Sequence, residues 1–348
     1  MFVRVKRVRL EDIARAAGVS VSTVSRALRG DEQVSVRTRR IVEIEARRLG
    51  YPFLPDSDGH NGEAAEVVRP IPGLKRLSIV LRETLQKHFF AETLLELIEQ
   101  GRQRDFEVDY EVRTDSLADC LASTDADAVV FILWEKVSLK DAEALQKHAK
   151  PVLVVNRHIH GMVNSLTLDD YAAGVQSVRY LWNLGHRRIA YIPGKQSASS
   201  FVERASGFRE ALNEYGIYDP ALFARLDDEA IYEAVREAVR QFMGSPHPPT
   251  AIAAYNDLTA WLALMTVGEL GYQVPEDVSI LGFDYAPEFR SYGITTWDYR
   301  RKDLGRYVVH LLDGLCRGDI EGPFRMAVMP TLIQGTTVGP VSGIRNRQ

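Results

Sequence analysis

Two hydrophobic patterns divide this chain into a short helical start and a long body of alternating strands and helices. In the body, short runs rich in Val, Ile and aromatic residues alternate with longer segments whose apolar residues recur at helical spacing. This alternation predicts the α/β class, with parallel sheets covered by helices on both faces. The predicted strands are LSIVL (77–81), DAVVFIL (127–133), PVLVVN (151–156), RIAYIP (188–193), TAIAAYN (250–256) and VSILGFD (278–284). The predicted helices include 90–104, 140–149, 171–184, 203–215, 230–243 and 257–270.

Residues 10 to 30, LEDIARAAGVSVSTVSRALRG, instead predict two short helices joined by a tight turn. Gly18 suits the exit of the first helix, because glycine adopts a left-handed backbone there without steric cost. Ser20 is a suitable N-cap for the second helix. Three apolar residues share one face of the first helix: Ile13, Ala14 and Ala17. The pattern is that of a helix-turn-helix.

The second helix separates an apolar face from a polar one. We expect Val21, Val24 and Leu28 to point inward. A third helix, from about residue 35 to 49, would add Ile41, Ile44 and Leu49 to the same small core. A helix of this width fits the major groove of DNA, where its N-terminal residues reach the base edges. The outer face therefore predicts sequence-specific DNA binding through Ser22, Thr23, Ser25, Arg26 and Arg29.

The distribution of charge supports this prediction. Residues 1–52 carry twelve Lys and Arg against six Asp and Glu, a net charge of +6. The rest of the chain has a net charge of −10, so the overall value of −4 conceals the contrast. A basic start on an acidic body indicates that one end alone contacts phosphates.

The motif AAGVSVSTVSRALRG, followed by Val34-Ser35 and by LGY at 49–51, resembles the head-piece of the LacI/GalR (lac repressor) family. The resemblance implies that Val21, Ser22 and Arg26 occupy base-reading positions. It also implies that Thr23 and Ser25 lie nearer the phosphates. The chemistry agrees, because serine and arginine hydrogen-bond to base edges, with arginine suited to guanine O6 and N7, whereas valine offers apolar contact to a thymine methyl.

The resemblance extends more loosely over the body, through PVLVVNR, LTLDDYAAGVQSVRYLWNLGHRRIAYIPG, ERASGFREAL, AIAAYNDLTAWLAL, ILGFDYAPEF and ITTWDYRRKDLG in family order. It implies a two-lobed sensor like the type I periplasmic binding proteins, with two Rossmann-like lobes that close on a small ligand. We expect the chain to cross between the lobes near residues 165, 297 and 328. The predicted parts are a head at 1–52, a linker at 53–74 and a body at 75–341, with lobe 1 at about 75–165 and 298–328 and lobe 2 at about 166–297 and 329–341.

The linker departs from the family pattern. Its prolines and glycines interrupt any long helix, and its acidic middle cannot bury itself. The family has a short hinge helix at this place, which inserts a leucine into the minor groove. Here Glu63 and Glu66 stand where cations would face phosphate, and no leucine is present between residues 55 and 73. We therefore expect an atypical hinge with little minor-groove insertion.

The carboxyl ends of parallel strands hold the ligand in this fold class. Carried over from the family, the effector-binding residues would be Phe89, Phe90, Asn156, Arg157, Arg204 and Asp257. Aromatic faces, a guanidinium fork and a carboxylate suit a polyhydroxylated or heterocyclic ligand. Each residue has a structural alternative: core packing for the two phenylalanines, a cap for Asn156, and ion pairs for the charged groups. Trp134 and Tyr299 are weaker candidates, and Asp284 is expected to tie its loop.

Other classes of protein receive less support. The sequence has no run of eighteen apolar residues, so it predicts no membrane span. It has no apolar segment behind the basic start, so it predicts no export signal. Cys120 and Cys316 are widely separated, which favours free buried thiols, and no ligand cluster predicts a metal or cofactor. No hydrolase, protease or phosphate-loop motif is present, and we expect His186, between a helix and a strand, to lie in a surface turn.

We therefore predict a cytoplasmic, ligand-responsive transcription regulator, a repressor that binds operator DNA as a homodimer. The family's commonest effector is a sugar or sugar derivative, and a purine or glycan fragment stays open. Gly293, Tyr299 and Gln334 depart from the residues common in the family at those positions. The alternatives are a solute-binding protein with the same body fold and, further away, an enzyme.

Overall fold

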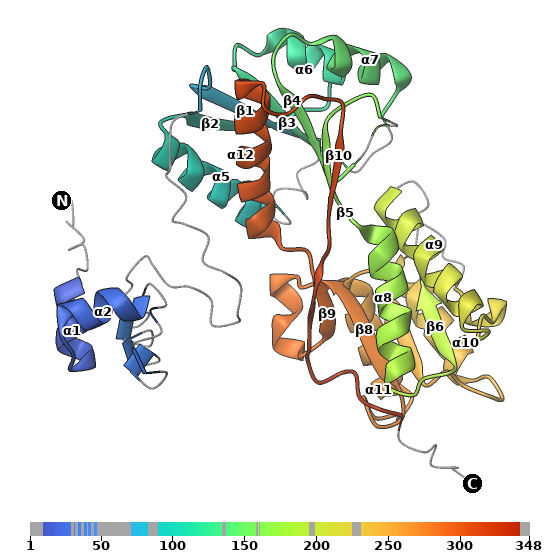
Figure 1. Ribbon diagram of the computed structural model, residues 1–348. Coiled ribbons are helices and arrows are strands. Elements are labelled where there is room, and N and C mark those ends of the chain that lie inside the picture. The colour runs from blue at the N-terminus through green and yellow to red at the C-terminus, as the bar shows by residue number, and fades with distance from the viewer. Residues whose placement is uncertain are drawn as a thin grey trace. The chain divides into compact units, whose positions relative to one another are not determined.

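The computed structural model separates the chain into two units, residues 1–68 and 69–348 (Figure 1). We describe each unit by itself. The described residues are 10–28, 31, 34–35, 38–39, 41–42, 45–46, 71–82, 90–133, 137–157, 159, 161–194, 199–224 and 231–341. Most of the predicted linker, as well as Arg29, Phe89 and Trp134, lies outside them.

The first unit contains the predicted helix-turn-helix, formed by α1 (Leu10–Ala17) and α2 (Val21–Leu28). Gly18 has a left-handed backbone with φ of +65°, and the Ser20 hydroxyl accepts the Thr23 N–H at 3.1 Å. Both features were expected from the sequence and are confirmed. The small core contains Ile13, Ala14, Val24, Ala27, Leu28, Val34, Val42 and Ala46.

Two details of the predicted head core are wrong. Val21 is 39% exposed, because it begins α2 and helical side chains lean toward the N-terminus, past the end of the helix. Ile41 is 41% exposed, whereas Val42 is buried, so the apolar face is rotated by one position from the expected one. Ile44 and Leu49 lie outside the described residues.

The second unit begins with a six-stranded parallel sheet in the order β10-β5-β4-β3-β1-β2. We name this sheet and its helices lobe 1. The strands are β1 (Arg76–Leu81), β2 (Glu107–Val112), β3 (Ala128–Ile132), β4 (Val152–Val155), β5 (Ser165–Leu168) and β10 (Arg325–Val328). The helices are α5 (Ala91–Arg104), α6 (Leu117–Ser123), α7 (Leu139–Lys147) and α12 (Arg301–Arg317). Two hydrophobic clusters show that α5 and α12 cover one face and α6 and α7 the other.

A five-stranded sheet in the order β11-β9-β8-β7-β6 forms lobe 2 with its helices. The strands are β6 (Ile189–Ile192), β7 (Ala251–Ala254), β8 (Ser279–Asp284), β9 (Thr295–Asp298) and β11 (Thr331–Ile333). The helices are α8 (Asp170–Asn183), α9 (Ser199–Glu214), α10 (Ile231–Met243) and α11 (Asp257–Glu269), with short 3₁₀ turns η1 (Pro220–Leu222) and η2 (Pro287–Tyr292). Helices α8 and α9 cover one face, and α10 and α11 the other. Only β11 among these strands runs antiparallel to its neighbour.

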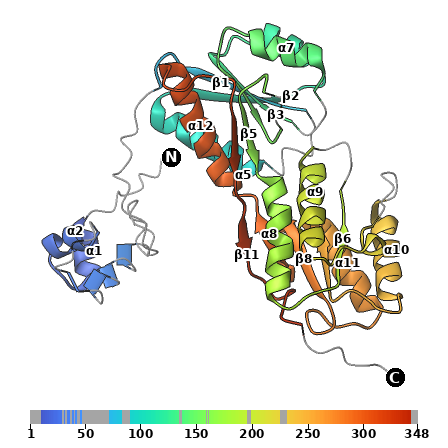
Figure 2. The same ribbon diagram turned by 45° about the vertical axis from the view of Figure 1, so that its right-hand side comes forward.

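The α/β class and all six predicted strands are thus confirmed, in two sheets of the predicted kind. The sequence analysis missed β2, an edge strand in which every residue is exposed or half-buried, and the short strands β5, β9, β10 and β11. Such strands have too few apolar residues to give a clear pattern. The chain passes between the sheets after β5, after β9 and after β10 (Figures 1 and 2).

His186 and the cysteines complete the comparison with the sequence. His186 is only 2% exposed, so the expected surface turn is wrong. Its imidazole bridges Thr250 and the carbonyl of Gly339, which fixes the C-terminal segment to lobe 2. Cys120 is buried and Cys316 partly buried, both as free thiols. Among the described helices, none has the length and apolar character that crossing a membrane requires.

Candidate DNA-binding and effector sites

The predicted DNA-reading residues lie on the outer side of α2. Val21, Ser22 and Arg26 are exposed, and Thr23 and Ser25 are partly exposed. Val24, Ala27 and Leu28 hold the opposite side of the helix in the core. The accessible side of the helix therefore presents three hydroxyls, one guanidinium and one apolar group, which are chemically able to contact base edges in a major groove.

Serine and threonine hydroxyls fix the start of this helix. The Ser20 hydroxyl lies 2.8 Å from that of Ser22 and 2.7 Å from that of Thr23. The same group caps the helix through the Thr23 N–H. A fixed first turn holds the reading side chains in place before DNA arrives, which lowers the entropy lost on binding.

In the second unit, Arg204 of α9 lies in a buried ion pair with Asp170 of α8. Its Nη2 and Nε donate to the same Asp170 oxygen at 2.6 and 3.1 Å, and Nη1 donates to the carbonyl of Tyr255. The guanidinium also stacks 3.3 Å from the ring centre of Phe283. Burial raises the pKa of Asp170 to about 6, although Arg204 opposes the shift. Arg204 therefore has a structural partner, and an effector would have to share it.

Asp257 has an equally complete set of protein partners. It opens α11 and is 2% exposed. One carboxylate oxygen accepts the Thr296 hydroxyl at 2.6 Å, and the other accepts the Ala286 N–H at 2.8 Å. Burial raises its pKa to about 6, with those two hydrogen bonds acting in the opposite direction. This geometry gives Asp257 the loop-holding role that the sequence reading assigned to Asp284.

Asp284 differs from both. It ends β8, is partly buried, and makes no side-chain hydrogen bond within the described part of the chain. Its pKa lies well above the ordinary value, first because of burial and further because of Asp257 and Asp170, while Arg204 and Arg301 oppose the shift. A partly buried carboxyl group without a hydrogen bond to the described residues retains acceptor capacity for hydroxyl or N–H donors. The sequence analysis gave Asp284 a structural role and did not place it among the effector-binding residues.

The remaining predicted residues have mainly structural environments. Phe90 precedes α5 and is fully buried in the core of lobe 1. The Asn156 amide donates to the Leu133 carbonyl at 3.1 Å and accepts the Tyr299 hydroxyl, so it ties two strand ends to the β9–α12 crossing. Arg157 is partly buried, and burial lowers its pKa against the attraction of Glu203. Effector contact by these residues stays a prediction.

The backbone around this region is unusual. Five described residues other than glycine have a positive φ, and four of them lie at strand ends or at a lobe crossing. These four are Asn156, Asp284, Tyr285 and Arg300. Such conformations cost about 1–3 kcal/mol each and persist where the surroundings enforce them, often at ligand sites. The strain and the buried charges thus coincide where the two lobes meet.

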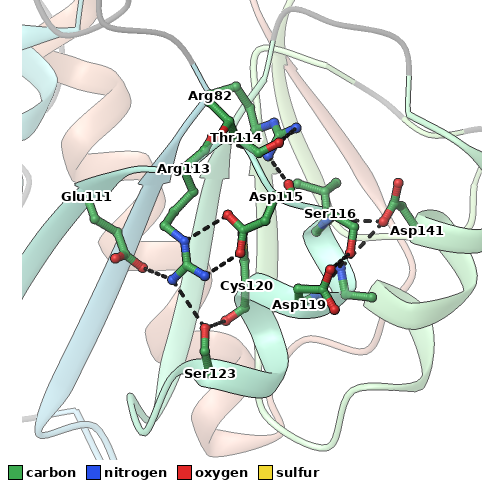
Figure 3. A network of polar contacts seen from close by, with 12 residues as sticks. Arg82, Glu111, Arg113, Thr114, Asp115, Ser116, Asp119, Cys120, Ser123 and Asp141 are labelled. Carbon is green, nitrogen blue, oxygen red and sulfur yellow. Dashed lines mark hydrogen bonds and ion pairs between the residues drawn. The ribbon is translucent and has the colours of Figure 1, made fainter.

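A separate polar network lies at the carboxyl ends of β1 and β2 (Figure 3). Arg82 donates to the carbonyls of Arg113, Thr114 and Asp115, and Arg113 pairs with the carboxylate of Asp115. Hydrogen bonding to Arg113 lowers the pKa of Asp115 to about 2. The carbonyls and carboxylates that surround these arginines are their partners, so this network fixes the β2–α6 loop. Across the described residues, no group of three His, Cys, Asp or Glu side chains is placed to hold a metal.

Comparison with known proteins matches both units. Residues 9–52 match the family model for bacterial regulatory proteins of the lacI family, and residues 178–338 match the periplasmic binding protein-like domain. The HTH-type transcriptional repressor CytR of Escherichia coli K12 is 29% identical over 341 residues, covering 94% of this chain and 96% of CytR. The HTH-type transcriptional regulator CelR of Thermobifida fusca is also 29% identical over 341 residues, covering 93% and 96%.

A solved structure gives the same result for the fold. The complex of the transcriptional regulator CelR with cellobiose superposes with a TM-score of 0.64 at 27% identity, covering 95% of this chain and all of that one. The helix-turn-helix, the two-lobed α/β body and the relatives therefore agree from one end of the chain to the other. The chain therefore combines a helix-turn-helix region similar to that of the lacI family with a periplasmic binding protein-like domain.

Proposed function

We propose that this protein is a sequence-specific transcriptional repressor, not an enzyme, that binds operator DNA as a homodimer and responds to a sugar or a similar hydroxyl-rich molecule. One observation carries the proposal: the same chain exposes a polar helix face suited to base edges and has a strained, charged junction between its lobes, where the partly buried Asp284 carboxyl group has no side-chain hydrogen bond to the described residues. The names of its relatives support it, since CytR is a repressor and CelR was solved with cellobiose.

DNA recognition would follow from α2. Arg26 would donate to guanine, Ser22 would contact a base edge, and Val21 would pack on a thymine methyl. Thr23, Ser25 and Arg29 would lie nearer the phosphates and fix the orientation of the helix. Two heads in a dimer would then read the two half-sites of a pseudo-palindrome.

The effector would bind where the lobes meet. Asp284 would accept hydroxyl or N–H donors, and Arg204, which uses three of its five N–H groups on the described protein atoms, would donate to the ligand with the others. We keep Phe89, Phe90, Asn156, Arg157 and Asp257 as residues that shape the site, with Asp257 acting through its hold on Ala286. The effector would carry both hydrogen-bond donors, for Asp284, and acceptors, for Arg204, as hydroxyl groups do.

Exposed apolar residues support the homodimer. Leu95 and Ile98 on α5 are 67% and 43% exposed, and Tyr292 on η2 is 43% exposed. Glu92 of α5 and Arg290 of η2 form an ion pair at 3.1 Å, so the two elements are neighbours. A second copy covering this face would contact both lobes at once. Effector binding would then change DNA affinity only as far as the effector prefers one lobe arrangement over the other.

The test uses the full-length protein. A panel of monosaccharides, disaccharides including cellobiose, nucleosides and purine bases is screened by thermal shift, and the hits are titrated by calorimetry. Asp284→Asn should reduce affinity for the hit at least about tenfold, because a buried partner of the ligand is lost. Asp105→Asn, on an exposed lobe 1 carboxylate, is the matched control.

DNA binding is tested in parallel with operators selected from a random pool. The wild type should enrich a two-fold symmetric sequence, and the hit should change its affinity for that sequence. Enrichment of no sequence would contradict the regulator. A hit whose affinity is equal in wild type and Asp284→Asn would leave the regulator standing but remove the proposed effector site.

A further inference from the structure

Arg301 is the largest side chain among the most deeply buried residues described, with 2% exposure. It is the first residue of α12 in lobe 1, yet its guanidinium points to lobe 2. Nη1 donates to the carbonyl of Asp284 at 2.7 Å, and Nη2 donates to that of Tyr285 at 2.9 Å. Its backbone carbonyl accepts the Thr93 hydroxyl at 2.7 Å, which fixes the start of α12 to α5.

Glu92 joins this arginine to a second one. Its two carboxylate oxygens lie 3.5 Å from Nε of Arg301 and 3.1 Å from Nη2 of Arg290. Arg290 belongs to lobe 2, its Nε donates to the same Tyr285 carbonyl at 3.4 Å, and its guanidinium lies 4.4 Å from the centre of the Tyr285 ring. Glu92 and Arg301 from lobe 1 therefore enclose a turn of lobe 2 together with Arg290.

The enclosed turn has a backbone that needs support. Asp284 and Tyr285 have φ values of +110° and +51°, which side chains other than glycine rarely adopt. Lobe 2 holds the N–H groups of this turn, through Thr296 to Tyr285 at 3.4 Å and Asp257 to Ala286 at 2.8 Å. Lobe 1 holds both carbonyl groups through Arg301, while Arg290 of lobe 2 gives the Tyr285 carbonyl a second, longer hydrogen bond. Without Arg301, only groups of lobe 2 would hold Asp284 and Tyr285 in their strained backbone conformation.

We propose that Arg301 is a positioning residue for the effector site, and that Glu92 makes the placement of Asp284 depend on how the two lobes are arranged. The inference rests on the proposed role of Asp284 in effector binding. A rearrangement of the lobes moves Arg301 with α12, so the Asp284 carbonyl loses this donor and the Tyr285 carbonyl keeps only the longer hydrogen bond from Arg290 among those described. Conversely, a ligand on Asp284 acts on α5 and α12, the helices that carry Glu92 and Arg301.

The chain supplies a matched control for this cluster. Arg306 of α12 and Glu96 of α5 form an ion pair at 3.1 Å between the same two helices, one turn further on. This pair stays within lobe 1. Glu96→Gln and Arg306→Met therefore disturb the α5–α12 contact without touching the turn in lobe 2.

The experiment measures hydrogen exchange in the full-length protein without ligand and without DNA. Arg301→Met should speed exchange of the peptide over residues 283–289 at least about tenfold, since it removes two charge-assisted hydrogen bonds. Glu92→Gln should speed it about two- to fivefold, because a partly exposed ion pair contributes less. Exchange in β7 serves as the internal reference for global opening. Arg301→Lys, which restores one donor, should recover part of the protection.

Salt separates the two contributions. Potassium chloride at high concentration screens the exposed Glu92 carboxylate but not the buried guanidinium–carbonyl bonds, so it should reproduce Glu92→Gln and leave that variant unchanged. The inference is overturned if Arg301→Met speeds exchange of the 283–289 peptide and of β7 by the same factor. It is also overturned if Glu92→Gln changes exchange of the 283–289 peptide no more than Glu96→Gln does. Should Arg301→Met not fold, the Glu92→Gln and Arg301→Lys arms decide. Failure of the ligand screen would contradict the effector site alone, because these readouts contain no ligand.

Discussion

The DNA-binding head and the sensor body place their polar chemistry in opposite environments. In the head, Ser22 and Arg26 are exposed, and a core of small apolar residues merely orients them. In the body, Asp170, Arg204 and Asp257 are each 2% exposed and bind mainly to one another or to backbone groups. An exposed polar group keeps its hydrogen-bonding capacity for DNA, whereas a buried charged group uses most of that capacity on neighbouring protein atoms.

This difference in burial implies that the head and the body respond differently to their binding partners. The head needs little change to bind DNA, because its reading groups already face outward. The body has strained backbone at Asp284, Tyr285 and Arg300, so a ligand bound there, as we propose, would alter the balance between lobe arrangements. Mutations should accordingly have their largest effects in the body and their most selective effects in the head.

The largest effect is expected at the buried ion pair. Arg204→Met should lower the free energy of unfolding of the body by about 3–5 kcal/mol, because it leaves the Asp170 carboxylate buried without its partner. The double variant Asp170→Asn/Arg204→Met should recover most of this loss. Chemical denaturation monitored by circular dichroism measures both. If Arg204→Met were as stable as the wild type, the buried ion pair of the body would contribute no more to stability than an exposed charge of the head.

The second effect is a decrease in the free energy of unfolding with rising pH, caused by a carboxyl group whose pKa is raised by burial. Burial raises the pKa of Asp257 from 3.8 to about 6, so the folded state binds an extra proton between these values. The free energy of unfolding should therefore fall as pH rises from about 4 to 6, by about 2–3 kcal/mol from this group, and change no further above pH 6. Asp257→Asn should remove this part of the pH dependence, as denaturation at a series of pH values would show.

Asp115 provides the contrast of opposite sign. Its pKa is lowered to about 2 by Arg113, so its stabilisation is present above about pH 4 and lost as pH falls toward 2. Asp115→Asn should therefore leave the slope between pH 4 and 6 unchanged. Equal slopes for Asp257→Asn and the wild type would contradict the assignment of this window to Asp257.

The same contrast explains how much the sequence could predict. The six apolar strands follow from periodicity, and the turn at Gly18 and the cap at Ser20 follow from local backbone chemistry, so these were predicted correctly, whereas five less apolar strands were missed. The partners of a buried charge are distant in the chain: Asp170 is 34 residues from Arg204, and Thr296 is 39 residues from Asp257. Local patterns contain no information on such pairs. The loop-holding hydrogen bonds expected at Asp284 are consequently found at Asp257.

A third prediction concerns the selectivity of the head. Arg26→Ala should weaken binding to a preferred operator by about 1–3 kcal/mol and relax the preference at one base position. Arg15→Ala, which removes an exposed charge from α1, should weaken binding to all sequences more evenly. Titrations against single-base operator variants at two salt concentrations distinguish the two. If both variants lost affinity equally at every base, Arg26 would act through its charge alone.

The smallest effect separates stability from reading within one turn of α2. Ser20 caps the helix, so Ser20→Ala should destabilise its first turn by about 1 kcal/mol and speed exchange of the Thr23 amide about fivefold. Ser22, exposed and bonded only to the Ser20 hydroxyl among the described groups, should tolerate alanine within about 0.5 kcal/mol. Hydrogen exchange and operator titrations on the same samples test both serines. Ser20→Ala should alter exchange more than base preference, and Ser22→Ala the reverse; an exposed hydroxyl whose loss changed stability but not base preference would place Ser22 with the structural groups of the body.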